Sequence, residues 1–216
     1  MYNERLLRLL AETQIPKVFL DTSSLVAPDE LNGDLLLMES RTSVRRITCH
    51  LLEQGRTLPG FIGDISYAQS NRERYEGFCQ ALADAGKKVD SSLCLTTPLG
   101  IDTYREEIDT FLSSLSRMPD AFVCASDYVA CILMQLLEKR GLRVPEDVAV
   151  SGFDNNTEDL LAEHLTTVQV FNEELGARLA LQILYRIKYP NTPHEITYLG
   201  TNVLYRDSTC LLYTSP

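Results

Sequence analysis

The sequence predicts an α/β protein with two lobes, each built on a sheet of parallel strands. Short apolar runs alternate with helical stretches of roughly 10 to 17 residues, which is typical of β-α-β units. Polar side chains follow several of the apolar runs, as they do at the ligand-binding edge of such sheets. The chain has 216 residues, 44% hydrophobic and 23% charged, so it is long and apolar enough to bury a proper core.

In the first half of the chain, breaker residues separate the expected elements. The first helix carries Leu6, Leu9 and Leu10 on one face, and Pro16 ends it. Gly55 and Gly86 end the next two helices, because glycine adopts the left-handed conformation that often follows a helix. The expected helices are 2–13, 42–54 and 69–85, and the expected strands are 17–20, 35–38, 59–63 and 89–95.

The second half continues the alternation. Asp102 and Asn172 are the expected N-caps of two helices, since their side chains accept hydrogen bonds from free backbone N–H groups. Gly141 stops a helix between them, and Pro190 ends the last one. The expected helices are 102–115, 128–140, 156–163 and 172–188, and the expected strands are 121–125, 148–151, 166–168 and 195–205.

These strands are more than one small sheet needs, which favours two sheets and therefore two lobes. Right-handed crossovers place helices on both faces of each sheet. No apolar stretch is long enough to span a membrane, so we expect no membrane partner. The net charge of −10 opposes binding of this chain by itself to a nucleic acid backbone.

The six cysteines form no C-x-x-C pair and have no histidine at ligand spacing, so we expect no zinc. Cys79, Cys124 and Cys131 lie in apolar runs and are expected to be small core residues. Unpaired thiols suit a reducing cytoplasm. The sequence also contains none of the common nucleophile, phosphate-loop or dinucleotide motifs, so we expect neither an enzyme nor a cofactor.

Polar acceptors follow four expected strands, so they should gather at one edge of the sheets. Asp21, Asp64 and Asp154 follow three of these strands, and Ser126 and Asp127 follow a fourth. Carboxylates and hydroxyls suit a neutral polyhydroxylated ligand, because its hydroxyl groups donate to them. The alternative is that such residues only cap the following helices, and for Ser126 and Asp127 both interpretations stay open.

Arg74 is the cation that stands out, because it lies in the first turns of the helix after the 59–63 strand. A guanidinium there could grip ligand hydroxyls or a carboxylate through its fork of donors. The alternative is a solvated helix residue paired with Glu73 or Glu76, and spacing alone favours that alternative.

Five segments together resemble the lactose/galactose repressor family of bacterial regulators. Residues 119–130 (PDAFVCASDYVA) and 141–155 (GLRVPEDVAVSGFDN) are similar to two of its motifs, and residues 74–78 (RYEGF) to a third. Residues 165–168 (LTTV) and 205–209 (YRDST) resemble two more. Their order and spacing agree with the family pattern over residues 1–209.

The resemblance implies a periplasmic-binding-protein-like effector domain in which a sugar or nucleobase binds in a cleft between two lobes. By position, Arg74 is then the cleft arginine, Asp154 the cleft carboxylate and Ser70 a further polar contact. Ser126 stands where the family usually has asparagine and is followed by Asp127, so both are candidate contacts. Family members are cytoplasmic homodimers that bind operator DNA through an N-terminal helix-turn-helix domain.

The resemblance also implies a division of the chain. Residues 1–39 and 165–190 form a partial first lobe, and residues 40–164 and 191–209 form the second. The helix-turn-helix domain and about two β-α units of the first lobe precede the matched region and are expected to be missing. Residues 210–216 resemble a translated sequencing adapter, and we hypothesise that they are not native; the alternative is a genuine short tail.

Three classes of function remain in competition. The first is the effector-binding and dimerisation portion of a transcription regulator, which the motifs and free cysteines favour. The second is a periplasmic sugar-binding protein of a transport system, which shares the fold. The third is an enzyme on an α/β scaffold, which has only the fold in its favour.

Overall fold

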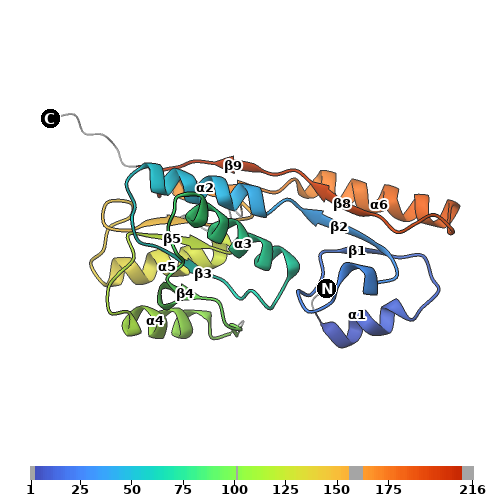
Figure 1. Cartoon of the computed structure of the whole chain (residues 1–216), viewed down its shortest axis with the longest axis horizontal. Helices are drawn as coiled ribbons and strands as arrows, with labels where there is room; N and C mark the ends of the chain where they lie inside the picture. The colour runs from blue at the N-terminus through green and yellow to red at the C-terminus, as the bar shows by residue number, and fades with distance from the viewer. Residues whose placement is uncertain (1–2, 101, 156–162, 211–216) are drawn as a thin grey trace.

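Two parallel sheets form the centres of two lobes, as the sequence predicts (Figure 1). The computed structural model describes residues 3–100, 102–155 and 163–210. The first sheet has the order β1-β2-β8, and the second has the order β4-β3-β5-β6. The strands are β1 (Val18–Leu20), β2 (Asp34–Met38), β3 (Pro59–Ile62), β4 (Cys94–Leu95), β5 (Ala121–Cys124), β6 (Ala149–Ser151) and β8 (Ile196–Leu199).

A third, two-stranded antiparallel pair joins the lobes and consists of β7 (Thr167–Gln169) and β9 (Asn202–Leu204). The helices are α1 (Glu4–Ala11), α2 (Arg41–Glu53), α3 (Gln69–Asp84), α4 (Tyr104–Ser114), α5 (Asp127–Lys139) and α6 (Asn172–Lys188). Within the described residues, no helix is long and apolar enough to cross a lipid bilayer.

The second lobe has three layers, because the strands of its sheet send alternate side chains to opposite faces. Phe61 and Val123 pack against α2 and α3. The neighbouring Ile62 and Cys124 pack against α4 and α5 on the other face. Cys131 is also buried there, as expected, whereas Cys79 is only half-buried.

Helices α2 and α3 approach closely at Gly77, where a Cβ atom would collide with the backbone carbonyl of Arg41. This contact sets the position of α3, which carries Arg74. A glycine is needed here for space and not for its backbone conformation.

The first lobe has a smaller core on one face of its sheet, where Leu7 of α1 packs against Phe19, Leu35 and Leu37. On the other face, α6 is held by polar contacts to the buried Asp34. Its carboxylate accepts hydrogen bonds from Arg186 and, at 2.9 Å, from Gln182 Nε2. Burial alone would raise the pKa of Asp34, but the hydrogen bonds from Arg186 and Gln182 hold it below its ordinary value.

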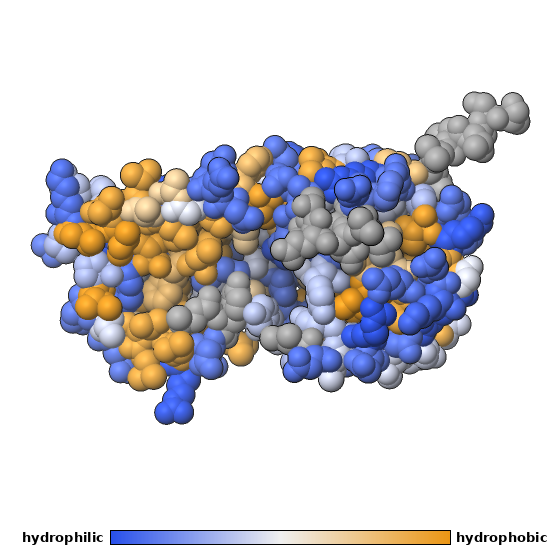
Figure 2. Space-filling model, turned by 180° about the vertical axis from the view of Figure 1, so that it is seen from behind, coloured by the Kyte–Doolittle hydropathy of each residue, from blue (hydrophilic) through white to orange (hydrophobic). Residues whose placement is uncertain are grey.

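Apolar side chains gather on the outer surface of the first lobe (Figure 2). On α6, Leu181, Leu184 and Ile187 recur at a spacing of three residues and are 61%, 62% and 58% exposed. This spacing places them on one stripe of the helix. We call this surface the α6 stripe.

Several expected boundaries were wrong. The 89–95 strand shrinks to β4, because Asp90 caps a 3₁₀ turn over Ser91–Leu93 and accepts a hydrogen bond from the Ser92 N–H. The 195–205 strand is split at Gly200 into β8 and β9, which lie in different sheets. The structure also begins α4 after Thr103 and α6 after Phe171, and neither of these N-cap residues makes a side-chain capping bond.

The expected division of the chain differs from the strand pairing at its end. β8 pairs with β2 through Leu36 and Thr197, so residues 196–199 belong to the first sheet and not to the second lobe. The final crossing between lobes therefore lies between β8 and β9. The expected 156–163 helix and the 210–216 tail lie almost wholly outside the described residues.

Candidate functional site

Arg74 is buried at the carboxyl edge of the second sheet and is only 4% exposed. Its Nη1 donates to the carbonyl of Ala125, directly after β5. Its guanidinium carbon lies 3.6 Å from the centroid of the Phe153 ring, after β6. The interpretation of Arg74 as a solvated helix residue is therefore wrong, since Glu76 pairs with Arg41 and Glu73 with Tyr198.

Asp154 lies opposite this arginine, with its Oδ1 3.5 Å from Arg74 Nη2. Its side chain is 43% exposed, so the carboxylate is open to an incoming group. Desolvation raises the pKa of Asp154 above its ordinary value, and the charge of Arg74 opposes that rise. The Asp154 N–H is bonded to the Val168 carbonyl at 3.1 Å, which ties the site to the strand that crosses between the lobes.

The backbone around Asp154 is strained, with φ of +108° at Asp154 and +52° at Asn155. A residue with a side chain adopts such values at a cost of roughly 1–3 kcal/mol and only where its surroundings impose them. The surroundings do so here, because Asn155 donates to Gln169 Oε1 at 2.5 Å and accepts from Arg206 Nη2 at 2.8 Å. In this conformation the Asp154 carboxylate lies beside Arg74.

Ser70 faces the first lobe. Its hydroxyl donates to Asp21 Oδ2 at 2.6 Å, and the Gln69 N–H donates to the Thr22 carbonyl at 2.8 Å. Asp21 follows β1, is fully buried and has φ of +55°. Ser70 was expected to be a polar contact of the ligand. In this structure its hydroxyl joins the start of α3 to the end of the first sheet.

Ser126 and Asp127 lie at the start of α5. The Ser126 hydroxyl accepts from the Val129 N–H at 3.3 Å and is the N-cap, as the alternative interpretation states. Asp127 is buried, and its Oδ1 accepts from the Thr167 hydroxyl at 2.6 Å. In this structure both side chains stabilise the carboxyl edge of the second sheet, next to the Arg74–Asp154 pair.

Sequence reasoning did not assign roles to Phe153 and Asn155, although both lie in a segment it singled out. Phe153 is fully buried beneath the guanidinium of Arg74, and Asn155 links β7 to Arg206. The available signal was their place in the Gly152–Asn155 segment that directly follows β6. Among the described residues, no group of three or more His, Cys, Asp and Glu side chains could hold a metal ion.

Arg74 and Asp154 place a fork of donors and a pair of acceptor oxygens side by side at the end of parallel strands. This pair can bind a small molecule through its hydroxyl, carbonyl or N–H groups. Such a site on two linked α/β lobes is typical of small-molecule-binding domains. The periplasmic binding protein-like domain family matches residues 48–209, and the chain belongs to that family.

The particular relatives are transcriptional regulators. The HTH-type transcriptional repressor PurR of Aliivibrio fischeri strain MJ11 is 29% identical over 209 residues, which are 95% of this chain and 61% of the relative. The HTH-type transcriptional regulator DegA of Bacillus subtilis strain 168 is 31% identical over 170 residues, 78% of this chain and 48% of the relative. The chain thus spans less than two thirds of the length of these curated relatives.

A solved structure of a transcriptional regulator also resembles this chain. A complex of the transcriptional regulator CelR with cellobiose is 26% identical and superposes with a TM-score of 0.77 over 95% of this chain and 69% of that one. The relatives favour the interpretation as part of a lactose/galactose-type regulator over that of a transport receptor.

Proposed function

We propose that this chain is the effector-binding and dimerisation portion of a transcriptional regulator. A sugar or nucleobase is the proposed effector, with Arg74 and Asp154 as its main contacts. The observation that carries the proposal is the buried arginine facing a half-exposed carboxylate at the strand ends of a family domain. This role needs no catalytic group and no cofactor.

The proposed effector is neutral and rich in hydroxyl or N–H groups. The Asp154 carboxylate accepts from such groups, and Arg74 donates to ring oxygens, carbonyls or ring nitrogens. A sugar is consistent with the relative that binds cellobiose. A neutral ligand adds no charge to the site, so the positive charge of Arg74 and the negative charge of Asp154 still neutralise each other.

Operator DNA binding is assigned to a helix-turn-helix domain outside this chain, because the net charge of −10 repels a phosphate backbone. We propose that the protein acts in the cytoplasm as a homodimer and that effector binding changes operator affinity. Such a change requires that the effector bind one arrangement of the lobes more tightly than the other.

Calorimetry with a panel of sugars and nucleobases tests the proposal. Arg74→Ala and Asp154→Ala are each expected to weaken binding of the responding ligand by about 1–3 kcal/mol, because each leaves a polar partner unpaired. Arg45→Ala is the matched control: it removes an arginine from α2 whose partner is Asp84, on the surface. Unchanged affinity in both site variants, with a ligand that binds the parent chain, overturns the site assignment.

A further inference from the structure

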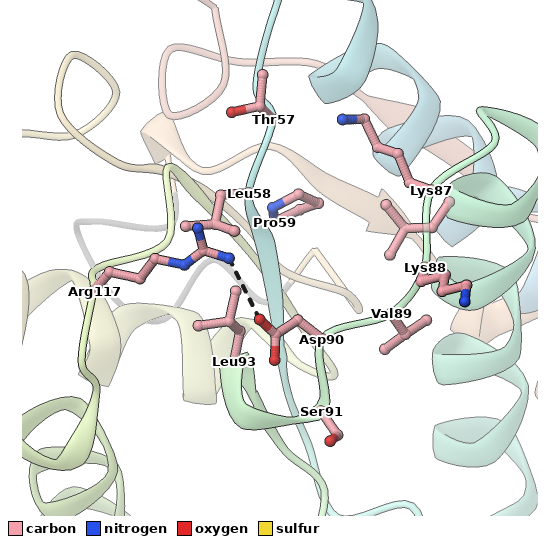
Figure 3. A pocket seen from close by; sticks show the side chains of 11 residues that line it. Thr57, Leu58, Pro59, Lys87, Lys88, Val89, Asp90, Ser91, Leu93 and Arg117 are labelled. Carbon is pink, nitrogen blue, oxygen red and sulfur yellow. Dashed lines mark hydrogen bonds and ion pairs between the residues drawn. The ribbon is translucent and has the colours of Figure 1, made fainter.

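A cavity lies at the end of the second lobe opposite the Arg74–Asp154 pair, where the strands of its sheet begin (Figure 3). Its volume is about 490 Å³, within the range of small-molecule sites. Leu58 and Pro59 lie at the start of β3, whereas the Arg74–Asp154 site lies beyond its end. The cavity is lined by Thr57, Leu58, Pro59, Leu82, Lys87, Lys88, Val89, Asp90, Ser91, Leu93 and Arg117.

The charge of this cavity is opposite to that of the chain. Three cationic side chains and one carboxylate line it, in a protein whose net charge is −10. Figure 3 shows the Lys87 side chain reaching across the opening toward Thr57, while the Lys88 ammonium points away from it. Arg117 extends from the opposite wall toward Asp90.

Arg117 is available to a ligand, because it is 62% exposed and its Nη2 lies 3.5 Å from Asp90 Oδ2. Asp90 itself is fixed, since its Oδ1 accepts from the Ser92 hydroxyl at 2.6 Å and from the Ser92 N–H at 3.1 Å. An anionic ligand can therefore draw the guanidinium away while Asp90 keeps its other contacts.

Apolar side chains lie between these charges. Leu82 and Leu93 are buried core residues, and Val89 and Leu58 line the cavity beside them. The Asp120 carboxylate fixes one rim by accepting hydrogen bonds from the Thr57 N–H at 2.6 Å and the Leu58 N–H at 2.9 Å. The cavity thus offers apolar surface from Leu58 and Val89 beside polar groups, with Lys87 and Arg117 at its mouth.

We propose that this cavity binds a small amphipathic anion, with its apolar body against Leu58 and Val89 and its charged group between Lys87 and Arg117. The site is separate from the Arg74–Asp154 pair and does not depend on the proposed effector. Leu82 and Arg74 lie eight residues apart on α3, which corresponds to about 12 Å along the helix axis.

Benzoate, its neutral analogue benzamide and inorganic phosphate are the probes, and methyl NMR of the chain is the readout. Benzoate is expected to shift the Leu58, Val89 and Leu93 methyl signals in a saturable manner, and benzamide to bind about two- to tenfold more weakly, because it lacks the charge. Inorganic phosphate, which has no apolar body, is expected to leave these methyl signals unchanged.

Four variants identify the groups responsible. Lys87→Gln and Arg117→Gln are each expected to weaken benzoate binding about two- to fivefold, and Asp90→Asn to strengthen it by a similar factor. Lys139→Gln is the matched control, because it makes the same change of charge at an exposed residue of α5 that does not line the cavity. Its expected affinity is that of the parent chain.

Three outcomes overturn the proposal. Benzoate produces no saturable shift at these methyl groups, or phosphate shifts them as strongly as benzoate does. In the third outcome Lys139→Gln weakens binding as much as Lys87→Gln, which would indicate attraction by overall charge and not a built site.

Discussion

Tyr198 of β8 donates its phenolic hydroxyl to the Glu73 carboxylate on α3 at 2.7 Å. This hydrogen bond joins the first sheet to the helix that carries Arg74, one residue further along. Glu73 is 3% exposed and also accepts from Gln69 Nε2 at 3.2 Å. The two lobes are thus joined by a buried carboxylate beside the proposed effector site.

We expect the Glu73–Tyr198 contact to make stability depend on pH. Burial raises the pKa of Glu73, the hydrogen bonds from Tyr198 and Gln69 and the charge of Arg41 oppose this rise, and Asp21 adds to it. A raised folded-state pKa means that this contribution to stability is complete below the ordinary range near pH 4.3 and is lost as pH rises through the folded value.

Urea denaturation across pH 4–8 tests this expectation. Glu73→Gln should remove the decline with rising pH, and Tyr198→Phe should deepen it, because the ionised carboxylate loses a donor. Glu106→Gln on α4 serves as a control and should leave the profile of the parent chain unchanged. If stability depended on pH equally in the parent and in Glu73→Gln, the expected role of Glu73 would be contradicted.

The Asp34–Arg186 pair should be costly to break, because both side chains are buried and hydrogen-bonded. Arg186→Leu is expected to lower the free energy of unfolding by about 3–5 kcal/mol, since it leaves an uncompensated buried carboxylate. The double variant Arg186→Leu/Asp34→Leu should recover part of that loss. A double-mutant cycle by chemical denaturation measures both, and a cycle without coupling would refute the expected role.

The Asp34–Arg186 pair should also make stability depend on pH in the acid range. The folded-state pKa of Asp34 lies below its ordinary value, so its stabilisation is present above about pH 3.9 and is lost as pH falls through the folded value. Asp34→Asn should therefore be less stable than the parent at neutral pH and lose less stability on acidification. Thermal unfolding between pH 2.5 and 6 measures the difference.

The two helical glycines at 77 and 176 should respond oppositely to alanine. Gly77→Ala forces α2 and α3 apart at the Arg41 carbonyl and is expected to destabilise the chain by about 1–3 kcal/mol. Gly176→Ala on α6 meets no atom within 4 Å and should stabilise by up to about 1 kcal/mol, because alanine is the better helix former. Similar values for both variants would disprove the close-packing argument.

The α6 stripe is expected to contribute to the proposed dimer. Exposed leucine and isoleucine side chains along one helix face favour association with another apolar surface. Leu184→Lys should lower the weight-average mass in sedimentation equilibrium, whereas Arg178→Lys, which keeps the charge on the same helix, should not. An unchanged weight-average mass in Leu184→Lys would contradict a role of the α6 stripe in the dimer interface.

The sequence pattern predicted the sheets well where strands are short, buried and followed by a polar residue, as at β3, β5 and β6. It failed where one side chain changed the local geometry. Asp90 accepts hydrogen bonds from Ser92, two residues further along, and the Ser91–Leu93 part of the expected strand forms a 3₁₀ turn. Asp90, Ser91 and Ser92 are residue types that favour such local bonds, so the sequence did carry a signal of this turn.

The candidate site was only partly predictable for a related reason. Strand periodicity and the family motif located Asp154 at a strand end. The burial of Arg74 depends on contacts with Ala125 and Asp154, which lie 51 and 80 positions away in sequence. Local spacing holds no information on such partners, so it favoured a solvated arginine.

The pairing of β8 with β2 has a consequence for how the protein is made. The Glu195 N–H reaches the Asp34 carboxylate across 161 positions of sequence. A ribosome that has released β1 and β2 has not yet synthesised the strand that completes their sheet. Contacts between such distant segments form slowly. The four strands of the second sheet can consequently pair while translation continues, whereas the first sheet keeps an open strand edge until β8 has been synthesised.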